Sequence, residues 1–400
     1  MMMIMSEKSA SPPHVLLISA GASHTVALLT GNVVCSWGRG EDGQLGHGDT
    51  DDRLLPTKLS AFDGQDIVSV TCGADYTVAR SKSGKDVYSW GCWGRNQNGE
   101  LGLGTTKDSH VPQKILAFEG IRIKMVAAGA EHSVAITEDG DLYGWGWGRY
   151  GNLGLGDTND RLIPEKVNID GDKIVMVSCG WRHTISISSS GGLYTHGWSK
   201  YGQLGHGDFE DCLVPRKVQA LSDKLISQVS GGWRHSMALT SNGQLFGWGW
   251  NKFGQIGIGH NFDCSSPMLV NFPHAQKVVQ MSSGWRHTVA VTDRANVYSW
   301  GRGANGQLGH GDTKDRNVPT IIDAFSVDGC SEQHIESSNY PLPGKSFASL
   351  SERYAVVPNE TALGSYATTS SDKSDKFDAS VPENDVSLDS PTINQFETMM

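Results

Sequence analysis

Three copies of a five-residue phrase place a tryptophan beside an arginine at a fixed spacing. The phrase reads GWRHT at 180–184, GWRHS at 232–236 and GWRHT at 284–288, with a step of 52 residues. A guanidinium over an indole face is worth about 0.5–2 kcal/mol, and its planar fork also binds carboxylates in pairs. Tryptophan absorbs at the long-wavelength edge of protein ultraviolet absorption, and clustered indoles can share excitation. The spacing predicts one aromatic, basic patch carried by three neighbouring structural units.

A longer repeat surrounds these phrases. The pattern W-G-x-x-x-x-G-x-L-G-x-G begins at Trp37, Trp93, Trp145, His196, Trp248 and Trp300. A second repeated position, a His or Tyr two or three residues after a glycine, recurs at the same spacing. It falls at His24, Tyr76, His132, His183, His235 and His287, and we call it the second marker. Six copies occupy 14–326. Short strands, tight turns such as Asp139-Gly140 and the absence of sustained helical periodicity predict a β-propeller with one four-stranded blade per copy, and a solenoid is the alternative.

The two residues before the second marker change character along the chain. They read Ala22-Ser23, Ala74-Asp75 and Ala130-Glu131 in the first three copies, and Trp-Arg in the last three. On a closed ring, a basic aromatic arc would face an acidic arc, and such a face is self-complementary under a two-fold axis. The competing interpretation is that Trp181, Trp233 and Trp285 only pack blade against blade.

Composition excludes several classes of function. The net charge of −10 argues against a general electrostatic grip on nucleic acid, and the seven cysteines show no CxxC spacing that would indicate zinc. No signal peptide and no apolar stretch of about 20 residues is apparent, so we expect a soluble intracellular protein. The G-x-G-x-x-G matches at Gly38–Gly43 and Gly301–Gly306 belong to repeat turns, not to a dinucleotide site. We expect no enzymatic activity, metal or cofactor.

These phrases are similar to those of the regulator of chromosome condensation repeat family. The three GWRHT/S copies resemble the plant ultraviolet-B photoreceptors within it, and the likeness covers about 14–362. The resemblance implies an all-β propeller, but members of the family have seven blades and this chain has six copies. Two W-G phrases look fused at Ser89–Gly94, where the step lengthens to 56 residues, as if one repeat were missing.

The resemblance also implies a function. It makes Trp233 the principal ultraviolet-B sensor, assisted by Trp181 and Trp285, with these intrinsic tryptophans as the chromophore. Light would weaken a homodimer whose interface includes Arg234, Arg286, Arg182, Arg95, Arg149, Glu131, Asp42 and Asp75. Because the missing copy comes from the acidic side, we expect a weakened or absent homodimer.

Three regions are expected: a disordered start (1–13), the propeller (14–326) and a disordered, acidic tail (327–400). Within the tail, SERYAVVPNE near 352–360 resembles a peptide that docks on the WD-repeat domain of an E3 ubiquitin ligase, with Tyr354, Val357 and Pro358 as anchors. Related WD-repeat regulators and chromatin or histones are further implied partners, and the cytoplasm and nucleus the implied locations.

Two other functions stay open. The first is guanine-nucleotide exchange on a Ran-type small GTPase, which would need a protruding insertion that the near-constant repeat length leaves little room for. The second is a propeller scaffold or decoy that does not sense light.

Overall fold

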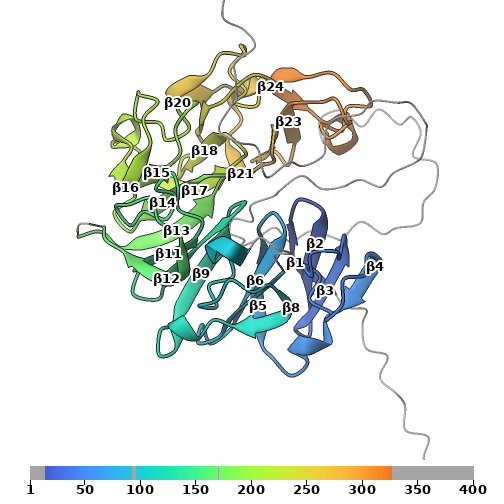
Figure 1. The fold of residues 1–400 in the computed structure, drawn as a ribbon. Coiled ribbons are helices and arrows are strands. Elements are labelled where there is room, and N and C mark those ends of the chain that lie inside the picture. Colours follow the sequence, from blue (N-terminus) through green and yellow to red (C-terminus); the bar gives the residue numbers. More distant parts are fainter. Residues whose placement is uncertain (1–13, 92–95, 170, 327–400) are drawn as a thin grey trace, which may run out of the picture. The chain divides into compact units, whose positions relative to one another are not determined.

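The computed structural model describes residues 14–91, 96–169 and 171–326, which form β-strands, short 3-10 helices and turns. The strands make six four-stranded antiparallel sheets, each from four consecutive strands. Figure 1 shows these sheets following one another in chain order, from blue to orange. The predicted six-bladed, all-β propeller is therefore confirmed. The expected disordered start (1–13) and tail (327–400) lie outside the described residues.

The strands are numbered along the chain, four to a blade. Blade 1 contains β1 (Val15–Ala20), β2 (His24–Leu29), β3 (Val33–Gly38) and β4 (Arg53–Lys58). Blade 2 contains β5 (Ile67–Cys72), β6 (Tyr76–Ser81), β7 (Val87–Gly91) and β8 (Ser109–Lys114). Blade 3 contains β9 (Ile123–Ala128), β10 (His132–Thr137), β11 (Leu142–Gly146) and β12 (Arg161–Val167).

Blade 4 contains β13 (Ile174–Cys179), β14 (His183–Ser188), β15 (Leu193–Gly197) and β16 (Cys212–Lys217). Blade 5 contains β17 (Ile226–Gly231), β18 (His235–Thr240), β19 (Leu245–Gly249) and β20 (Cys264–Val270). Blade 6 contains β21 (Val278–Ser283), β22 (His287–Thr292), β23 (Val297–Gly301) and β24 (Arg316–Ile321). The 3-10 helices are η1 (Ser60–Phe62), η2 (Asn96–Asn98), η3 (Leu116–Phe118), η4 (Gln219–Leu221), η5 (Pro273–Ala275) and η6 (Asp323–Phe325).

The second strand of an inner blade is covered on both sides, and its sequence fits that position. Every residue of β14 is buried, and its isoleucines alternate with serines and a threonine. Such small hydroxyl residues fit a strand with a blade against each face because they hydrogen-bond without filling the space between sheets. The tight turn predicted at Asp139-Gly140 joins β10 to β11, and Gly140 takes the left-handed conformation there, with φ of 80°.

Apolar side chains fill the space between consecutive blades. Five clusters are present among the described residues, one for each pair from blades 1 and 2 to blades 5 and 6. Between blades 5 and 6, Met237 and Leu239 of β18 meet Val278 and Met281 of β21 and Trp300 of β23. The blade pairs are thus held mainly by buried apolar area, at roughly 25 cal/mol per Å².

The repeated histidines join one blade to the next. The Nε2 atoms of His24, His132, His183 and His235 lie 2.9, 3.0, 2.9 and 3.3 Å from hydroxyls of the following blade, on Thr77, Thr184, Ser236 and Thr288. In blade 2, the hydroxyl of Tyr76 donates to the carbonyl of His132 at 2.6 Å instead. Burial lowers the pKa of these four histidines to about 3, so they are neutral structural links.

The fused phrase in blade 2 requires a correction. The tryptophan that ends the third strand packs against the preceding loop and donates its Nε1–H to a backbone carbonyl there, as Trp145 does to Glu100 at 3.1 Å. In blade 2 this role belongs to Trp90, which donates to the carbonyl of Gln44 at 2.9 Å, and not to Trp93. Three extra residues therefore separate this tryptophan from Gly99, and part of that longer loop, including Trp93, lies outside the described residues.

The first and last blades do not pack on each other as neighbouring blades do. Neighbouring blades make extensive contacts between their strands, and no comparable contact joins the described strands of blades 6 and 1. Val15 and Ile18 in β1 are 61% and 51% exposed, although the equivalent residues of β5 are buried. The described six-bladed array therefore has two uncovered ends.

Candidate functional site

The three Trp-Arg pairs lie in the turns between the first and second strands of blades 4, 5 and 6. Their indoles form a continuous row: the ring centroids of Trp181 and Trp233 are 5.3 Å apart, and those of Trp233 and Trp285 are 5.2 Å apart. All three side chains are half-buried. Each turn is fixed by the histidine that follows it, so the regular packing of blades sets the spacing of the indoles.

An arginine lies against each part of this row. The guanidinium carbon of Arg182 is 3.9 Å from the centroid of the Trp181 ring, and that of Arg234 is 3.8 Å from the centroid of Trp233. Arg286 lies 4.6 Å from the Trp233 ring, closer than the 5.6 Å to its own neighbour Trp285. Trp233 therefore has two guanidinium groups within 4.6 Å of its ring centroid, whereas Trp181 has one at 3.9 Å and a second at 5.4 Å.

A second row of aromatic residues, which the sequence analysis missed, completes the cluster. Trp198 lies 5.7 Å from Trp181, and Trp250 lies 5.3 Å from Trp233, both edge-on. The loops between the third and fourth strands of blades 3 to 5 supply it: Trp147, Tyr150, Trp198, Tyr201, Trp250 and Phe253. The signal was present in the sequence, because the repeat reads G-W-x-x-Y/F-G only in these three copies.

Arg234 occupies the centre of the two rows. Its guanidinium carbon lies within 5.6 Å of five aromatic centroids, those of Trp181, Trp198, Tyr201, Trp233 and Trp250. Its Nη1 also donates to the hydroxyl of Tyr201 at 2.7 Å. A planar cation can stack on rings from two loops and hydrogen-bond at its edge at the same time, which an ammonium cannot.

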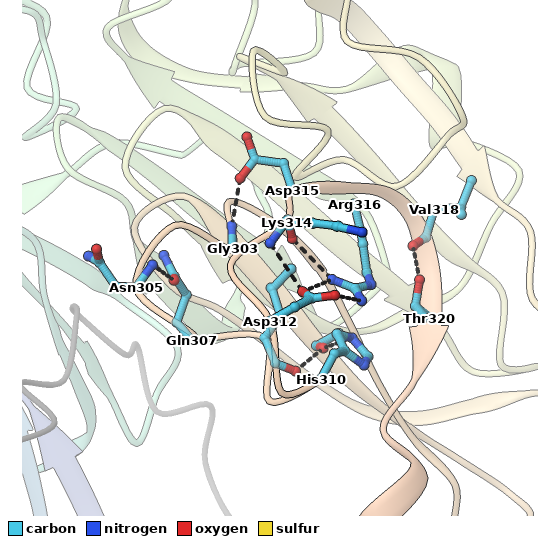
Figure 2. Close-up of polar contacts among 12 residues, drawn as sticks. Gly303, Asn305, Gln307, His310, Asp312, Lys314, Asp315, Arg316, Val318 and Thr320 are labelled. Atoms are coloured by element: carbon cyan, nitrogen blue, oxygen red, sulfur yellow. Dashed lines mark hydrogen bonds and ion pairs between the residues drawn. The ribbon is translucent and has the colours of Figure 1, made fainter.

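The loops that carry the second row are stiffened by a hydrogen bond that recurs in every blade. In all six blades a backbone N–H near the loop start donates to an aspartate twelve residues on, as Ser199 does to Asp211 at 2.7 Å and Asn251 to Asp263 at 2.8 Å. Figure 2 shows the version in blade 6, where Gly303 donates to Asp315 and Arg316 pairs with Asp312. The ring positions are thus set by loop geometry and not by the rings alone.

Burial and a nearby carboxylate shift the pKa of Arg182 in opposite directions. Desolvation lowers the pKa of Arg182, and Glu131 in blade 3 partly offsets it. Glu131 is half-buried, and Arg149 is exposed at the edge of the same region. The structure therefore brings Arg182, Glu131 and Arg149, three of the predicted interface residues, into one neighbourhood.

The other predicted interface residues have different positions. Asp42 is only 6% exposed, and its carboxylate lies 3.4 Å from Arg39 of the same chain, so burial and an internal partner limit what it can offer a second copy. Asp75 is half-buried and also acts electrostatically on Arg39. Arg95, Tyr354, Val357 and Pro358 lie outside the described residues, and the interface and docking roles stay predictions.

Glu100 is an unexpected acid in the acidic part of the chain. Its place in the repeat is taken by Gln or Asn in every other copy: Gln44, Asn152, Gln203, Gln255 and Gln307. Glu100 is 2% exposed and accepts a hydrogen bond from Asn98 at 2.9 Å. Burial, with smaller contributions from Glu131 and Asp160, raises the pKa of Glu100 to about 8 against the lowering effect of the hydrogen bond from Asn98. The side chain is therefore mostly neutral at pH 7.

The described residues hold no group of three or more His, Cys, Asp or Glu arranged to bind a metal ion. No described helix is long and apolar enough to cross a bilayer.

Comparison with known proteins identifies the family. Residues 5–337 match the model of the RCC1-like domain. The chain belongs to the RCC1-like family. Within it, the chain is 62% identical to the Ultraviolet-B receptor UVR8 of Arabidopsis thaliana, over 96% of this chain and 98% of that protein. The aligned stretch is 435 residues long, more than the 400 of this chain, so the alignment contains gaps here, as a missing repeat requires.

Two further matches are more distant. The mouse E3 ubiquitin-protein ligase HERC2 is 31% identical over 79% of this chain, which corresponds to 7% of that protein. The crystal structure of Prp20p from Saccharomyces cerevisiae superposes with a TM-score of 0.68 at 24% identity, covering 77% of this chain and 76% of that one. At this identity the likeness to Prp20p shows the fold alone.

Proposed function

We propose that the chain is an ultraviolet-B receptor whose chromophore is the tryptophan cluster of blades 3 to 6. The observation that supports this most is the row of Trp181, Trp233 and Trp285, with centroids 5.2–5.3 Å apart and arginines lying on the rings. The relative UVR8 is named an ultraviolet-B receptor, and at 62% identity it is a close relative. No cofactor is needed, because the indoles absorb the light.

The same face would also bind a second copy. In the dark, Arg182, Arg234 and Arg286 stack on indoles and meet carboxylates of the partner, with Glu131, Asp75 and Arg149 at the edges. Interfacial charge pairs can couple by about 1.5 kcal/mol or more each. Excitation that moves charge among Trp233 and its arginines would weaken several such contacts together. The homodimer would then open.

The opened chain would signal through its tail. We propose that residues 352–360 dock on the WD-repeat domain of an E3 ubiquitin ligase, with Tyr354, Val357 and Pro358 as anchors, in the cytoplasm and nucleus. An acidic segment with a short apolar motif suits binding in an extended conformation. No observation favours nucleotide exchange over this function.

The test compares Trp233→Phe with Trp37→Phe, which also removes one indole but lies outside the cluster. Size-exclusion chromatography of each protein in the dark and after ultraviolet-B, with the ligase's WD-repeat domain added, measures dimer opening and docking. We expect the wild type and Trp37→Phe to respond to light and Trp233→Phe not to. A light response that persists in a correctly folded Trp233→Phe protein would exclude Trp233 as the sensor.

A further inference from the structure

The two ends of the blade array expose faces that are buried at every junction between described blades. Val15 and Ile18 occupy the positions of Ile67 and Val70, which are buried against blade 1. Trp37 is half-buried, whereas Trp90, Trp145, Trp248 and Trp300 are fully buried. We call the surface formed by Val15 and Ile18 the first-blade face.

Blade 6 exposes the side that, in the other blades, packs on the blade that follows. Val289, Val291 and Val297 are half-buried, although the equivalent residues of blade 5, Met237, Leu239 and Leu245, are buried by blade 6. Phe325 is 60% exposed, whereas its counterparts Phe62 and Phe118 are buried. We call the surface formed by Val289, Val291, Val297 and Phe325 the last-blade face.

Among the described residues, specific contacts that join other blades are also missing at the last-blade end. A Cβ on Gly254 would lie 2.4 Å from Asn317 of the next blade, whereas a Cβ on the equivalent Gly306 would meet no described atom within 4 Å. A Cβ on Gly257 would meet Trp300, but at Gly309 the nearest atoms belong to Ile322 of the same blade. Blades 1 and 6 therefore each present a surface of the kind that packs on a neighbouring blade, but no described blade covers it.

The loop between β23 and β24 of blade 6 is held in place without a following blade. In Figure 2 the loop between β23 and β24 is held by its own contacts, from Gly303 to Asp315, from Asn305 to Gln307 and from Arg316 to Asp312. The side chain of Ser299 also donates to the carbonyl of Leu308 at 2.6 Å. Docking on the last-blade face would not have to order the loop first, which removes one cost of association.

We propose that the last-blade face of one chain docks on the first-blade face of a second copy. The occupant follows from the chain itself, because faces of these two kinds pack on each other at five junctions within it. The contact is head-to-tail, so a docked pair still has one free face of each kind, and further copies can add. It uses the flat sides of the end blades, separate from the Trp-Arg turns, and stands whether or not the chain senses light.

Two charged substitutions separate the two faces. Ile18→Lys disables the first-blade face and Phe325→Lys the last-blade face, and both side chains are exposed, so folding should survive. Leu116→Lys, at a 70% exposed position on neither face, is the control. Sedimentation of the full-length proteins in 0.5 M NaCl, where charge contacts are screened, measures the mass at rising concentration.

We expect the wild type and Leu116→Lys to associate progressively and each face variant alone to stay monomeric. An equimolar mixture of Ile18→Lys and Phe325→Lys should form a pair of two chains and stop, because only one intact face of each kind remains. Amide hydrogen exchange should show β1 and β22 becoming protected as the wild-type concentration rises.

Three results would overturn the proposal. If the wild type stays monomeric with β1 unprotected, the faces do not associate. If the wild type associates but the mixture of variants does not, the contact is not head-to-tail. If β1 is protected at every concentration, the chain covers its own ends, and loss of that protection on removing residues 327–400 would identify the tail as the cover.

Discussion

Trp233 is the middle indole of its row and contacts aromatic rings of both rows. Its ring lies 5.2–5.3 Å from those of Trp181, Trp250 and Trp285, and both Arg234 and Arg286 lie on it. Offset and edge-on aromatic pairs at such distances are worth about 0.5–1.5 kcal/mol beyond their buried area. A change at this position therefore affects the whole cluster, whereas a change at Trp285 removes one end of it.

The optical consequence can be measured on the dark protein. Rings in van der Waals contact couple their transitions, so we expect Trp233→Phe to remove most of the near-ultraviolet circular dichroism of the cluster. Trp37→Phe, with the same number of indoles left, should reduce that signal only slightly. Equal losses in the two variants would show that the signal does not come from the contacts of Trp233.

Glu100 gives a prediction on pH. Its pKa is raised by burial to about 8, so the folded protein holds a proton that the unfolded chain releases near the ordinary carboxyl pKa. Its contribution to stability is complete below that ordinary value and is lost as the pH rises toward 8. Within this window the slope is ~1.4 kcal/mol per pH unit.

Denaturant unfolding of Glu100→Gln between pH 5 and pH 8 checks this. The variant restores the amide of the other repeats, so its stability should lack that slope and exceed the wild type most at pH 8. Glu131→Gln, at a half-buried acid nearby, is the control and should retain most of the wild-type slope. Parallel curves for Glu100→Gln and the wild type would contradict the assignment.

At the scale of the element, the loop glycines report whether a neighbouring blade is present. Gly254 and Gly306 occupy the same loop position in blades 5 and 6 and have φ of 78° and 74°. Both lie in the left-handed region, where a side chain costs roughly 1–2 kcal/mol. Only Gly254 has a following blade against it, with the Cα of Asn317 at 2.4 Å from a Cβ placed there.

The pair Gly254→Ala and Gly306→Ala therefore separates backbone strain from the clash. We expect Gly306→Ala to lower the free energy of unfolding by about 1 kcal/mol and Gly254→Ala by several times that amount. Thermal or denaturant unfolding of dilute protein measures both. If the two losses are equal, blade 6 has a neighbour in solution.

At the scale of the molecule, two kinds of association are proposed on two different surfaces. The turn face carries arginines, carboxylates and indoles, whereas the end faces carry valine, isoleucine and phenylalanine. Salt screens the first kind, since the Debye length falls from about 10 Å at 0.1 M to 3 Å at 1 M, and it leaves apolar contacts intact. Ionic strength therefore separates the two.

We expect the dark, light-sensitive dimer to weaken at least about tenfold between 0.05 and 0.5 M NaCl, which corresponds to ~1.4 kcal/mol. Analytical ultracentrifugation of Ile18→Lys, which cannot associate through the end faces, measures this dimer alone. The same series with Arg286→Ala should show a weaker dimer and a smaller salt effect. A salt-independent dimer would argue against an interface held by charge.

The regular part of the molecule was predictable from sequence, because each blade follows from local spacing. The period near 52 residues indicated the blades, and the GWRH phrases indicated which turns would bring the indoles together. The sequence did not show which tryptophan of the fused repeat takes the structural position, because Trp90 and Trp93 are each followed by a glycine. Only the hydrogen bond from Trp90 to Gln44 distinguishes them. Nor were the burial of Asp42 and the uncovered ends, because both depend on contacts between distant parts of the chain.

Blade 2 joins a third strand from one side of the fused phrase to a fourth strand from the other, and its sheet is complete. The join falls between β7, which ends at Gly91, and β8, which begins at Ser109, so the three extra residues do not interrupt a strand. Excising a whole period between two such loops would therefore leave every remaining sheet intact and shorten the array by one unit. The number of blades in a propeller of this type could therefore be changed by deleting whole repeats between equivalent loops.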